Sequence, residues 1–410
     1  MCTRAHEPLR GAADAALCAQ ARPLRLSRTL RPRARAPRRG NAAAPDPARP
    51  RERAELDLQA RRPGRRQDRV LVRRRRRRTA HRVRPRQSLR VRGGGVRVRV
   101  RPLPEGGTIG VPAPASPYEN RSDVLRGVEW WESKGYRVKL SEAALARDDY
   151  VAGAAEQRAR DLEAMFSDPE VDVVQALQGG YGSAQTIPHL DFDVIARNPK
   201  PFVGYSDITA LHTAIRRRVG LPTFYGVGLT GTGDKETTQF TRARLLAVLR
   251  GEATGEVPRD PDDPFVRSIR GGRVTAPLVG GCLWLLLQTM GTPWELDLEG
   301  SIFFFEDVDA PPWYVDGMLT QLRQAGKLQG VVGVVVGDME KCDWREERPE
   351  WPRTKSIEDV LEEQLEPLHV PVIYKLPLGH GKHLATLPLG VTCTLDADAR
   401  TLTVDESPFA

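Results

Sequence analysis

The stretch "PFVGYSDITALHTAIRRRV", residues 201–219, decides the fold. Its apolar start, Phe202–Val203, reads as a short buried strand, and residues 207–219 have apolar side chains at helical spacing. Upstream, "VDVVQAL" (171–177) is a continuous run rich in β-branched residues, of the kind buried on both faces of a parallel sheet. Strand and helix continue to alternate through "PTFYG" (222–226), which predicts a doubly wound α/β domain.

Changes in composition divide the chain into four segments. We expect an Arg/Ala/Pro-rich disordered segment (1–97), an N-terminal α/β domain (98–235), a polar connector around one helix (236–273) and a β-rich α+β domain (274–410). The last domain should end in a hairpin, because "VTCTLDADARTLTVDE" (391–406) places alternating residues on both sides of a polar turn.

The net charge of +10 conceals two unlike parts of the chain. The first 100 residues hold 31 Arg, no Lys and 7 acidic residues (+24), which leaves 32 basic and 46 acidic residues (−14) for the rest. An acidic body is not expected to bind nucleic acid. The five Cys contain no CxxC pair, which indicates reduced thiols in a cytoplasmic protein. No apolar run has the length of a membrane span, and the N-terminus lacks the apolar core of a signal peptide.

The Arg-rich segment admits three interpretations. It is a disordered arm that binds nucleic acid or anionic surfaces, a transit peptide poor in Ser, or a translation artefact of GC-rich DNA. We favour the artefact, because 31 Arg without a single Lys is typical of a wrong reading frame or too early a start. No Met lies between Met1 and Met165, so the true start would be a non-ATG codon near Val96, Val98 or Val100.

Ser206 stands between the predicted strand and the predicted helix, where two roles are open. As a nucleophile it would have the unpaired N–H groups of a helix N-terminus available for an oxyanion. As an N-cap it would only close the helix. The surrounding residues lack the final glycine of a G-x-S-x-G elbow, so local sequence alone favours the cap.

Two further segments carry candidate chemistry. "QGGYGS" (178–183) follows a buried strand, and its glycines permit the backbone to approach a ligand closely. The segment is either a phosphate cradle or only a tight turn, and it lacks the P-loop lysine. Glu306 ends the apolar strand "SIFFFE", either as an acid at the surface or as a buried carboxylate that needs a partner such as His.

Among the five histidines of the body, His380 is the best placed for catalysis, because it lies between two glycines after a strand. With His383 it forms an H-x-x-H without a third ligand, so we expect no metal and no cofactor. His212, within a predicted helix, is expected to be a packed or surface residue.

Four blocks, in order, resemble the LD-carboxypeptidases, or muramoyltetrapeptide carboxypeptidases, a serine peptidase family that includes the microcin C self-immunity peptidases. The resemblance covers about residues 102–408. It rests on "GGTIGVPAPAS" (106–116), "GGYGS…PFVGYSDITALHTAI" (179–215), "VGGCLWLLLQTMGTPWELDLEGSIFFFEDVDAPPWYVDGMLTQL" (279–322) and "LPLGHGKHLATLPLG" (376–390).

The resemblance implies a site and a fold. The family's Ser-Glu-His triad maps by motif onto Ser206, Glu306 and His380. It further implies an oxyanion held by the backbone N–H groups of Asp207 and Gly180, and substrate contacts from Gly179, Tyr181 and Gly182. The N-terminal domain would be similar to class I glutamine amidotransferases and carry the nucleophile, with the active site in an interdomain cleft.

The implied activity is hydrolysis of the bond between an L-centre and a C-terminal D-residue of murein tetrapeptides, by a cytoplasmic homodimer. Two alternatives stay open: an immunity-type peptidase that cleaves peptidyl-nucleotides, and a ligand-binding protein without catalysis. Three departures from the family's pattern bear on the substrate and leave the triad intact: Gln178, Gly280-Gly281-Cys282 and Gly226-Val227.

Overall fold

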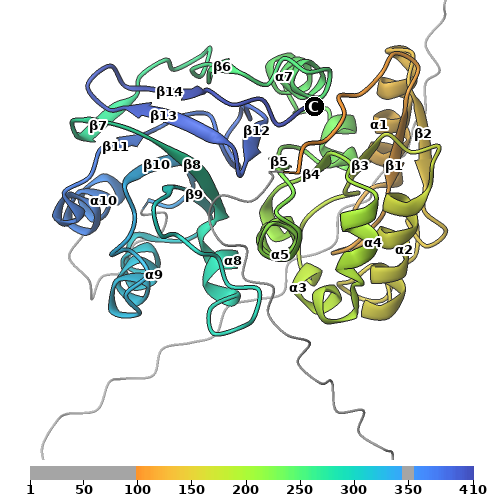
Figure 1. Ribbon diagram of the computed structural model, residues 1–410, viewed down its shortest axis with the longest axis horizontal. Coiled ribbons are helices and arrows are strands. Elements are labelled where there is room, and N and C mark those ends of the chain that lie inside the picture. The colour runs from red at the N-terminus through yellow and green to blue at the C-terminus, as the bar shows by residue number, and fades with distance from the viewer. Residues whose placement is uncertain (1–97, 344–354) are drawn as a thin grey trace, which may run out of the picture. The chain divides into compact units, whose positions relative to one another are not determined.

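The computed structural model of the chain describes residues 98–343 and 355–410. The segment expected to be disordered, residues 1–97, lies outside the described residues. Two sheets, each accompanied by helices, account for most of the described chain (Figure 1).

The first sheet is built mainly from the N-terminal half of the described chain. Its six strands lie in the order β2 (Arg137–Leu140), β1 (Thr108–Val111), β3 (Val173–Gln175), β4 (Phe202–Gly204), β5 (Thr223–Tyr225) and β12 (Leu387–Leu389). Strands β1 to β5 are parallel, whereas β12 returns from the C-terminal half and pairs antiparallel with β5.

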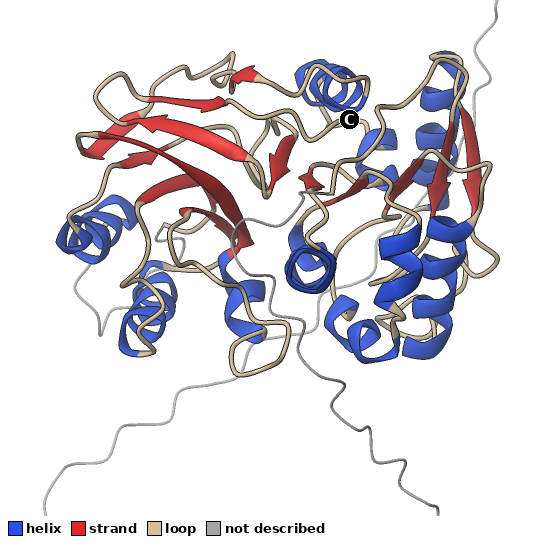
Figure 2. Ribbon diagram, in the orientation of Figure 1, coloured by secondary structure: helices blue, strands red, loops and turns tan. Residues whose placement is uncertain are grey.

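The helices of this part cover both faces of the sheet (Figure 2). The chain steps from β1 to β2 in one direction and then returns past β1 to β3, β4 and β5. The helices are α1 (Arg121–Ser133), α2 (Ala155–Ser167), α3 (Ser183–Thr186), η1 (Ile187–His189), α4 (Phe192–Arg197), η2 (Ser206–Ile208), α5 (Thr209–Val219) and α6 (Leu229–Gly233). Because parallel crossovers are right-handed, this reversal puts α1 on the opposite face from α2, α4 and α5, while α6 packs against α1. This arrangement confirms the predicted doubly wound α/β fold.

The residues that follow lead into the second sheet. Helix α7 (Gln239–Leu249) is capped by Thr238, whose side chain accepts a hydrogen bond from the N–H of Thr241. Two short strands, β6 (Gly255–Glu256) and β7 (Arg267–Arg270), then form the two opposite edges of the second sheet.

The second sheet has eight strands and confirms the β-rich character expected of the C-terminal half. Between β6 and β7 lie, in order, β14 (Thr401–Val404), β13 (Thr392–Asp396), β8 (Arg273–Cys282), β9 (Ile302–Val308), β10 (Gly333–Glu340) and β11 (Val372–Tyr374). Strands β8 to β11 are parallel, and the other pairs are antiparallel. The predicted hairpin is confirmed as β13 and β14.

Strand β9 divides its side chains between two apolar cores. Phe303 and Phe305 pack with the helices α8 (Leu283–Gln288), α9 (Pro312–Gln324) and α10 (Ile357–Leu365), which is followed by η3 (Glu366–Leu368). Ile302 and Phe304 belong to the larger core that contains the first sheet. Because side chains alternate along a strand, Glu306 points to the same side as Phe304. The period of the strand thus turns this carboxylate toward the first sheet.

Cys282 and Cys393 are buried free thiols, and Cys342 is buried as well. Within residues 98–343 and 355–410, no helix combines the length and the apolar character that crossing a bilayer requires.

Candidate active site

The candidate site residues follow the carboxyl ends of strands from both sheets. The glycine loop follows β3, Ser206 follows β4, and Tyr225 ends β5 in the first sheet. Glu306 lies near the end of β9 in the second sheet, and His380 comes after β11. In open α/β sheets this edge is where ligands bind.

Ser206 occupies a strained turn. Its φ is +61°, in the left-handed region that residues other than glycine rarely adopt. The residue opens η2, whose N-cap is Tyr205, and no side chain in the described part of the protein caps that helix. The interpretation of Ser206 as an N-cap is therefore wrong. Strained backbone outside glycine clusters at functional sites, so the turn favours a chemical role for this serine.

Glu306 is fully buried, so the interpretation of this residue as a surface acid is wrong. Its Oε1 accepts a hydrogen bond from the hydroxyl of Tyr225 at 2.5 Å. Its Oε2 accepts from His380 twice, from the backbone N–H at 3.2 Å and from Nδ1 at 2.7 Å. Both carboxylate oxygens thus have the partners that a buried charge requires.

The close approach of the His380 segment to Glu306 depends on glycine. Gly379 has φ +134°, and a methyl group on its α-carbon would lie 2.4 Å from Oε2 of Glu306. No larger residue fits between the carboxylate and the backbone that delivers the imidazole.

The His380 side chain is 15% exposed, and its ring lies 5.0 Å from the ring of Tyr205, the residue before Ser206. Burial alone would lower its pKa, but the charge and hydrogen bond of Glu306 outweigh burial and raise it above the ordinary value of 6.5. With Nδ1–H donating to Glu306, a neutral ring keeps its lone pair on Nε2. No hydrogen bond joins Ser206 and His380 among the described residues; such contacts often form only when substrate binds.

The glycine loop touches the Ser206 turn. A methyl group on Gly179 would lie 2.9 Å from Cβ of Ser206 and 3.3 Å from the backbone nitrogen of Asp207. The Asp207 N–H lies in the first turn of a helix, where N–H groups have no intrahelical acceptor. Gly180 follows with φ +96°, and a methyl group on its α-carbon would lie 2.5 Å from Ser116 Oγ. The two N–H groups proposed for the oxyanion therefore belong to adjoining segments.

Buried polar groups fix the shape of this loop. The guanidinium of Arg158 donates to the carbonyl of Gly182 at 2.7 Å and to that of Pro114 at 2.6 Å. The Ser183 N–H donates to the Asp207 carboxylate at 2.7 Å. Burial raises the pKa of Asp207, against the lowering effect of these hydrogen bonds. Because an acid already occupies this N–H group, a phosphate cradle is not supported.

Tyr181 is the member of the predicted substrate-contacting set whose side chain reaches solvent. It is 46% exposed, and its ring meets that of Tyr150 edge-on at 5.5 Å. Its N–H donates to Ser116 Oγ at 3.0 Å, which ties the loop to the segment after β1.

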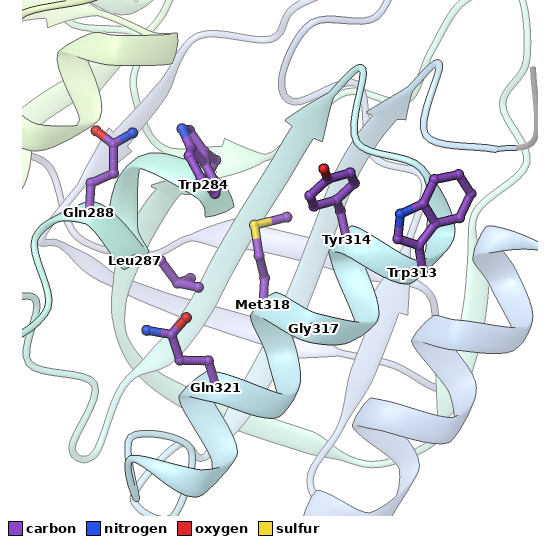
Figure 3. A pocket seen from close by; sticks show the side chains of 8 residues that line it. All are labelled: Trp284, Leu287, Gln288, Trp313, Tyr314, Gly317, Met318 and Gln321. Atoms are coloured by element: carbon purple, nitrogen blue, oxygen red, sulfur yellow. The ribbon is translucent and has the colours of Figure 1, made fainter. Parts of the chain in front are cut away.

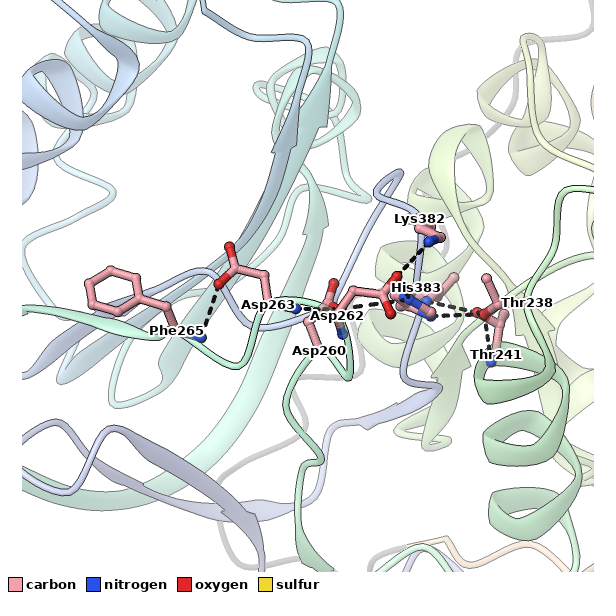
Figure 4. A network of polar contacts seen from close by, with 9 residues as sticks. Thr238, Thr241, Asp260, Asp262, Asp263, Phe265, Lys382 and His383 are labelled. Atoms are coloured by element: carbon pink, nitrogen blue, oxygen red, sulfur yellow. Dashed lines mark hydrogen bonds and ion pairs between the residues drawn. The ribbon is translucent and has the colours of Figure 1, made fainter.

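The two residues of the H-x-x-H pair serve different partners. His383 Nδ1 lies 2.9 Å from Thr238 Oγ1, and Nε2 lies 3.1 Å from Asp262 Oδ2 (Figure 4). Lys382 pairs with the same Asp262 at 2.5 Å. Sequence reasoning missed that His383 lies near Asp260 and Asp262, with one ligand atom from each within 4.8 Å of the others. This network anchors the segment after His380 to the connector.

A separate pocket of about 330 Å³ lies between α8 and α9 (Figure 3). Trp284, Trp313 and Tyr314 supply aromatic walls, and Gln288 and Gln321 supply amides. None of the candidate triad residues lines it. The two helices that line the pocket, α8 and α9, follow the strands that contain Cys282 and Glu306, respectively. The pocket is distinct from the Glu306–His380 pair.

Several residues of the site were not found by sequence reasoning. The sequence pattern predicts only that Tyr225 belongs to a buried strand and that Arg158 belongs to a helix. Asp307 is buried beside Glu306, and burial raises its pKa to about 6. Its carboxylate accepts a hydrogen bond from the N–H of Trp284 at 2.9 Å. A signal for Tyr225 was available. It ends the strand that follows the Ser206 strand in the sequence, and in a parallel sheet with these two strands side by side its side chain lies near Ser206.

The structure also shows the surroundings of Cys282 and His212, whose roles the sequence left undecided. Cys282, at a departure from the family's pattern, donates its N–H to Thr209 Oγ1 at 3.0 Å, and its thiol is 3.9 Å from Asp307 Oδ1. His212 is a packed residue: burial lowers its pKa to about 4, and its Nε2 lies 2.9 Å from the Gly204 carbonyl.

Comparison with known proteins gives a consistent result. Residues 109–226 match the LD-carboxypeptidase N-terminal domain, and residues 275–395 match the C-terminal domain. The chain is 34% identical over 304 residues to the probable murein peptide carboxypeptidase of Bacillus subtilis, covering 74% of this chain and 93% of the relative. It is 26% identical over 334 residues to the microcin C7 self-immunity protein of Escherichia coli, covering 74% of this chain and 95% of that protein.

Among solved structures, the muramoyltetrapeptide carboxypeptidase of Oxalobacter formigenes is similar with a TM-score of 0.63 and 28% identity, over 72% of this chain and 97% of that one. Both domains of the family are matched in order, and a relative above 30% identity is covered over nearly its whole length. The chain belongs to the LD-carboxypeptidase family of serine peptidases.

Proposed function

We propose that this protein is a serine LD-carboxypeptidase that releases the C-terminal D-amino acid from murein tetrapeptides, with Ser206, Glu306 and His380 as its triad. The observation that carries the proposal is the buried Glu306–His380 pair, whose imidazole lies against the residue before a strained serine. A serine on a helix-initiating turn, a neutral base and a buried carboxylate are the parts that acyl transfer requires.

In the proposed acylation step, Nε2 of neutral His380 removes the proton from Ser206 Oγ as the oxygen attacks the scissile carbonyl carbon. Glu306 holds the imidazole through Nδ1 and stabilises the imidazolium that forms. The N–H groups of Asp207 and Gly180 are the proposed donors to the oxyanion; loss of one such donor typically costs about 10²–10³ in rate.

The tetrahedral intermediate then collapses. His380 transfers its proton to the leaving amine, the C–N bond breaks, and the D-amino acid departs. Water, deprotonated by His380, then attacks the acyl-enzyme ester. The Ser206–acyl bond breaks, and His380 returns the proton to Ser206 Oγ, which gives the shortened peptide and the free serine. We place Gly179, Tyr181 and Gly182 along the bound peptide, because they form the loop next to the Ser206 turn.

The test is to incubate the full chain with the tetrapeptide L-Ala-D-Glu-meso-diaminopimelate-D-Ala and to measure free D-Ala. We expect release by the wild type and a fall of at least about 10³-fold in Ser206→Ala. Ser133→Ala, at the exposed end of α1, is the matched control and should keep the wild-type rate. Equal release by the wild type and Ser206→Ala would contradict the proposal.

A second candidate function is cleavage of peptidyl-nucleotide conjugates by the same triad. It is favoured by the similarity to the microcin C7 self-immunity protein over 95% of that protein's length. If the wild type leaves the tetrapeptide intact, a peptidyl-adenylate analogue should be tried next. Cleavage of the analogue alone, abolished in Ser206→Ala, would favour this function. Turnover of neither substrate would favour a ligand-binding role.

A further inference from the structure

We infer that Tyr225 is a positioning residue, whose hydroxyl joins the nucleophile turn to the triad carboxylate and sets the basicity of His380 through Glu306. This inference rests on the proposed function, because it assigns a role within the same triad. Tyr225 lies at the end of β5, next to the strand that leads to Ser206.

The tyrosine hydroxyl makes two hydrogen bonds of opposite direction. The backbone N–H of Ser206 donates to Oη at 3.2 Å. Oη–H donates to Oε1 of Glu306 at 2.5 Å, since a carboxylate can only accept. One oxygen atom therefore connects a strained residue of the first sheet to a buried charge of the second.

The surroundings hold the hydroxyl in this role. Tyr225 is fully buried, and its ring packs edge-on against Phe304 of β9 at 5.3 Å. Burial and the charge of Glu306 raise the pKa of Tyr225 well above its ordinary value, so the phenol stays protonated as a donor. The ring also packs near Tyr205 and His212, which leaves it little freedom to rotate away.

The bond to Glu306 affects His380 because the two oxygens of one carboxylate share its charge. A donor on Oε1 draws negative charge away from Oε2, the atom that faces His380 Nδ1. Loss of the donor concentrates charge at Oε2, favours the imidazolium and raises the pKa of His380. The hydroxyl therefore keeps the base neutral at lower pH than it would be with Glu306 alone.

The test compares Tyr225→Phe with Tyr136→Phe in the full chain. Tyr136 is an equally suitable site for deletion of a hydroxyl, because it is buried and accepts a hydrogen bond from Arg250 at 2.6 Å, at the opposite edge of the sheet. In Tyr225→Phe we expect kcat to fall about 10- to 100-fold with KM unchanged, since the hydroxyl is buried and its hydrogen bonds go to Ser206 and Glu306. The acid limb of kcat/KM should move up by roughly 0.5–1 pH unit. Tyr136→Phe should keep both values.

A second readout does not depend on turnover. Titration of the His380 ring by NMR, with its signal assigned by His380→Ala, should give a higher pKa in Tyr225→Phe than in the wild type. Should Tyr225→Phe fail to fold, 3-fluorotyrosine at position 225 keeps the shape, and its more acidic hydroxyl should shift the His380 titration downward. An unshifted or oppositely shifted titration would overturn the inference.

The two proposals fail in different ways. Equal tetrapeptide turnover by the wild type and Ser206→Ala contradicts the proposed function. Turnover that depends on Ser206, with Tyr225→Phe indistinguishable from Tyr136→Phe in rate and pH profile, contradicts only the role of Tyr225. A purely structural role would lower the stability of Tyr225→Phe and leave the pH profile in place.

Discussion

Glu306 Oε2 receives two hydrogen bonds from one residue, His380, through its backbone N–H at 3.2 Å and its ring Nδ1–H at 2.7 Å. The carboxylate therefore fixes both the position of the loop and the orientation of the imidazole. This double contact links the acid-base properties of the His380 ring to the geometry of its own backbone.

The first prediction concerns pH. His380, as the proposed general base, must be neutral to accept a proton, so the rate should fall as pH drops through the pKa of His380. Because Glu306 raises that pKa, the acid limb of the wild type should lie above pH 6.5. In Glu306→Gln the negative charge is gone, so the limb should move to lower pH while kcat falls about 10³–10⁴-fold. A pH–rate profile of both proteins measures this; an acid limb that stays in place would contradict the role of Glu306.

The second prediction concerns the backbone. In Gly379→Ala the new methyl group would lie 2.4 Å from Glu306 Oε2, so the His380 segment must move away. We expect a loss of about 100-fold in kcat from the displaced imidazole. Gly135→Ala is the matched control, because Gly135 also has positive φ (+85°) but no atom of residues 98–343 or 355–410 within 4 Å of the added methyl group. Its cost should be about 1–2 kcal/mol in unfolding free energy, with kcat intact. Equal activity of the two variants would count against the close approach.

The third prediction concerns stability. Burial, with the nearby charge of Glu306, raises the pKa of Asp338 to about 7, and its Oδ2 has no hydrogen-bond partner among the described residues. The folded state thus holds this proton more tightly than the unfolded state, and the associated stability is complete below about pH 4 and lost as pH rises through 7. Asn resembles the protonated acid, so Asp338→Asn should be more stable than the wild type at pH 8, by on the order of 2–4 kcal/mol, and not at pH 4.

Urea unfolding at the two pH values measures this difference. Asp398→Asn, in the exposed turn between β13 and β14, is the control and should show no such dependence on pH. A gain for Asp338→Asn that is the same at both values would mean that the charge of the carboxylate is not the cause.

The fourth prediction concerns metals. Asp260, Asp262 and His383 lie close enough to share an ion, but Lys382 already pairs with Asp262, and both ring nitrogens of His383 have protein partners. We expect EDTA or 1,10-phenanthroline to leave the rate unchanged. A working metal site would instead be identified if the wild type lost activity on chelation and regained it with Zn²⁺, while Asp262→Asn showed neither response.

Much of the fold could be predicted because its signals are local. The buried run at 171–177 and the strand and helix at 201–219 specify a parallel sheet, and the alternation at 391–406 specifies the hairpin. Three features could not be predicted in this way. The left-handed φ of Ser206 depends on its contacts, the hydroxyl of Tyr225 finds partners only through tertiary packing, and the three-residue strand β12 has too short a pattern to be recognised.

The candidate site shows the same division between local and tertiary information. The resemblance to the family pointed to Ser206, Glu306 and His380, but local sequence favoured a helix cap for the serine, because nothing near it indicates strain. Contacts between Asp262 and His383 join residues far apart in the chain, and no periodicity reports them. The hydrogen-bond and ion-pair partners that hold each candidate side chain in place could not be predicted from the sequence.

The antiparallel pairing of β12 with β5 also has an evolutionary consequence. The chain contributes its outermost strand of the first sheet only after it has passed His380. A gene fusion or recombination that exchanged the C-terminal half between relatives would also exchange this strand, and with it the edge of the sheet that carries Ser206. The halves that supply the proposed nucleophile and its proposed base are therefore expected to be inherited together, as one unit rather than as interchangeable modules.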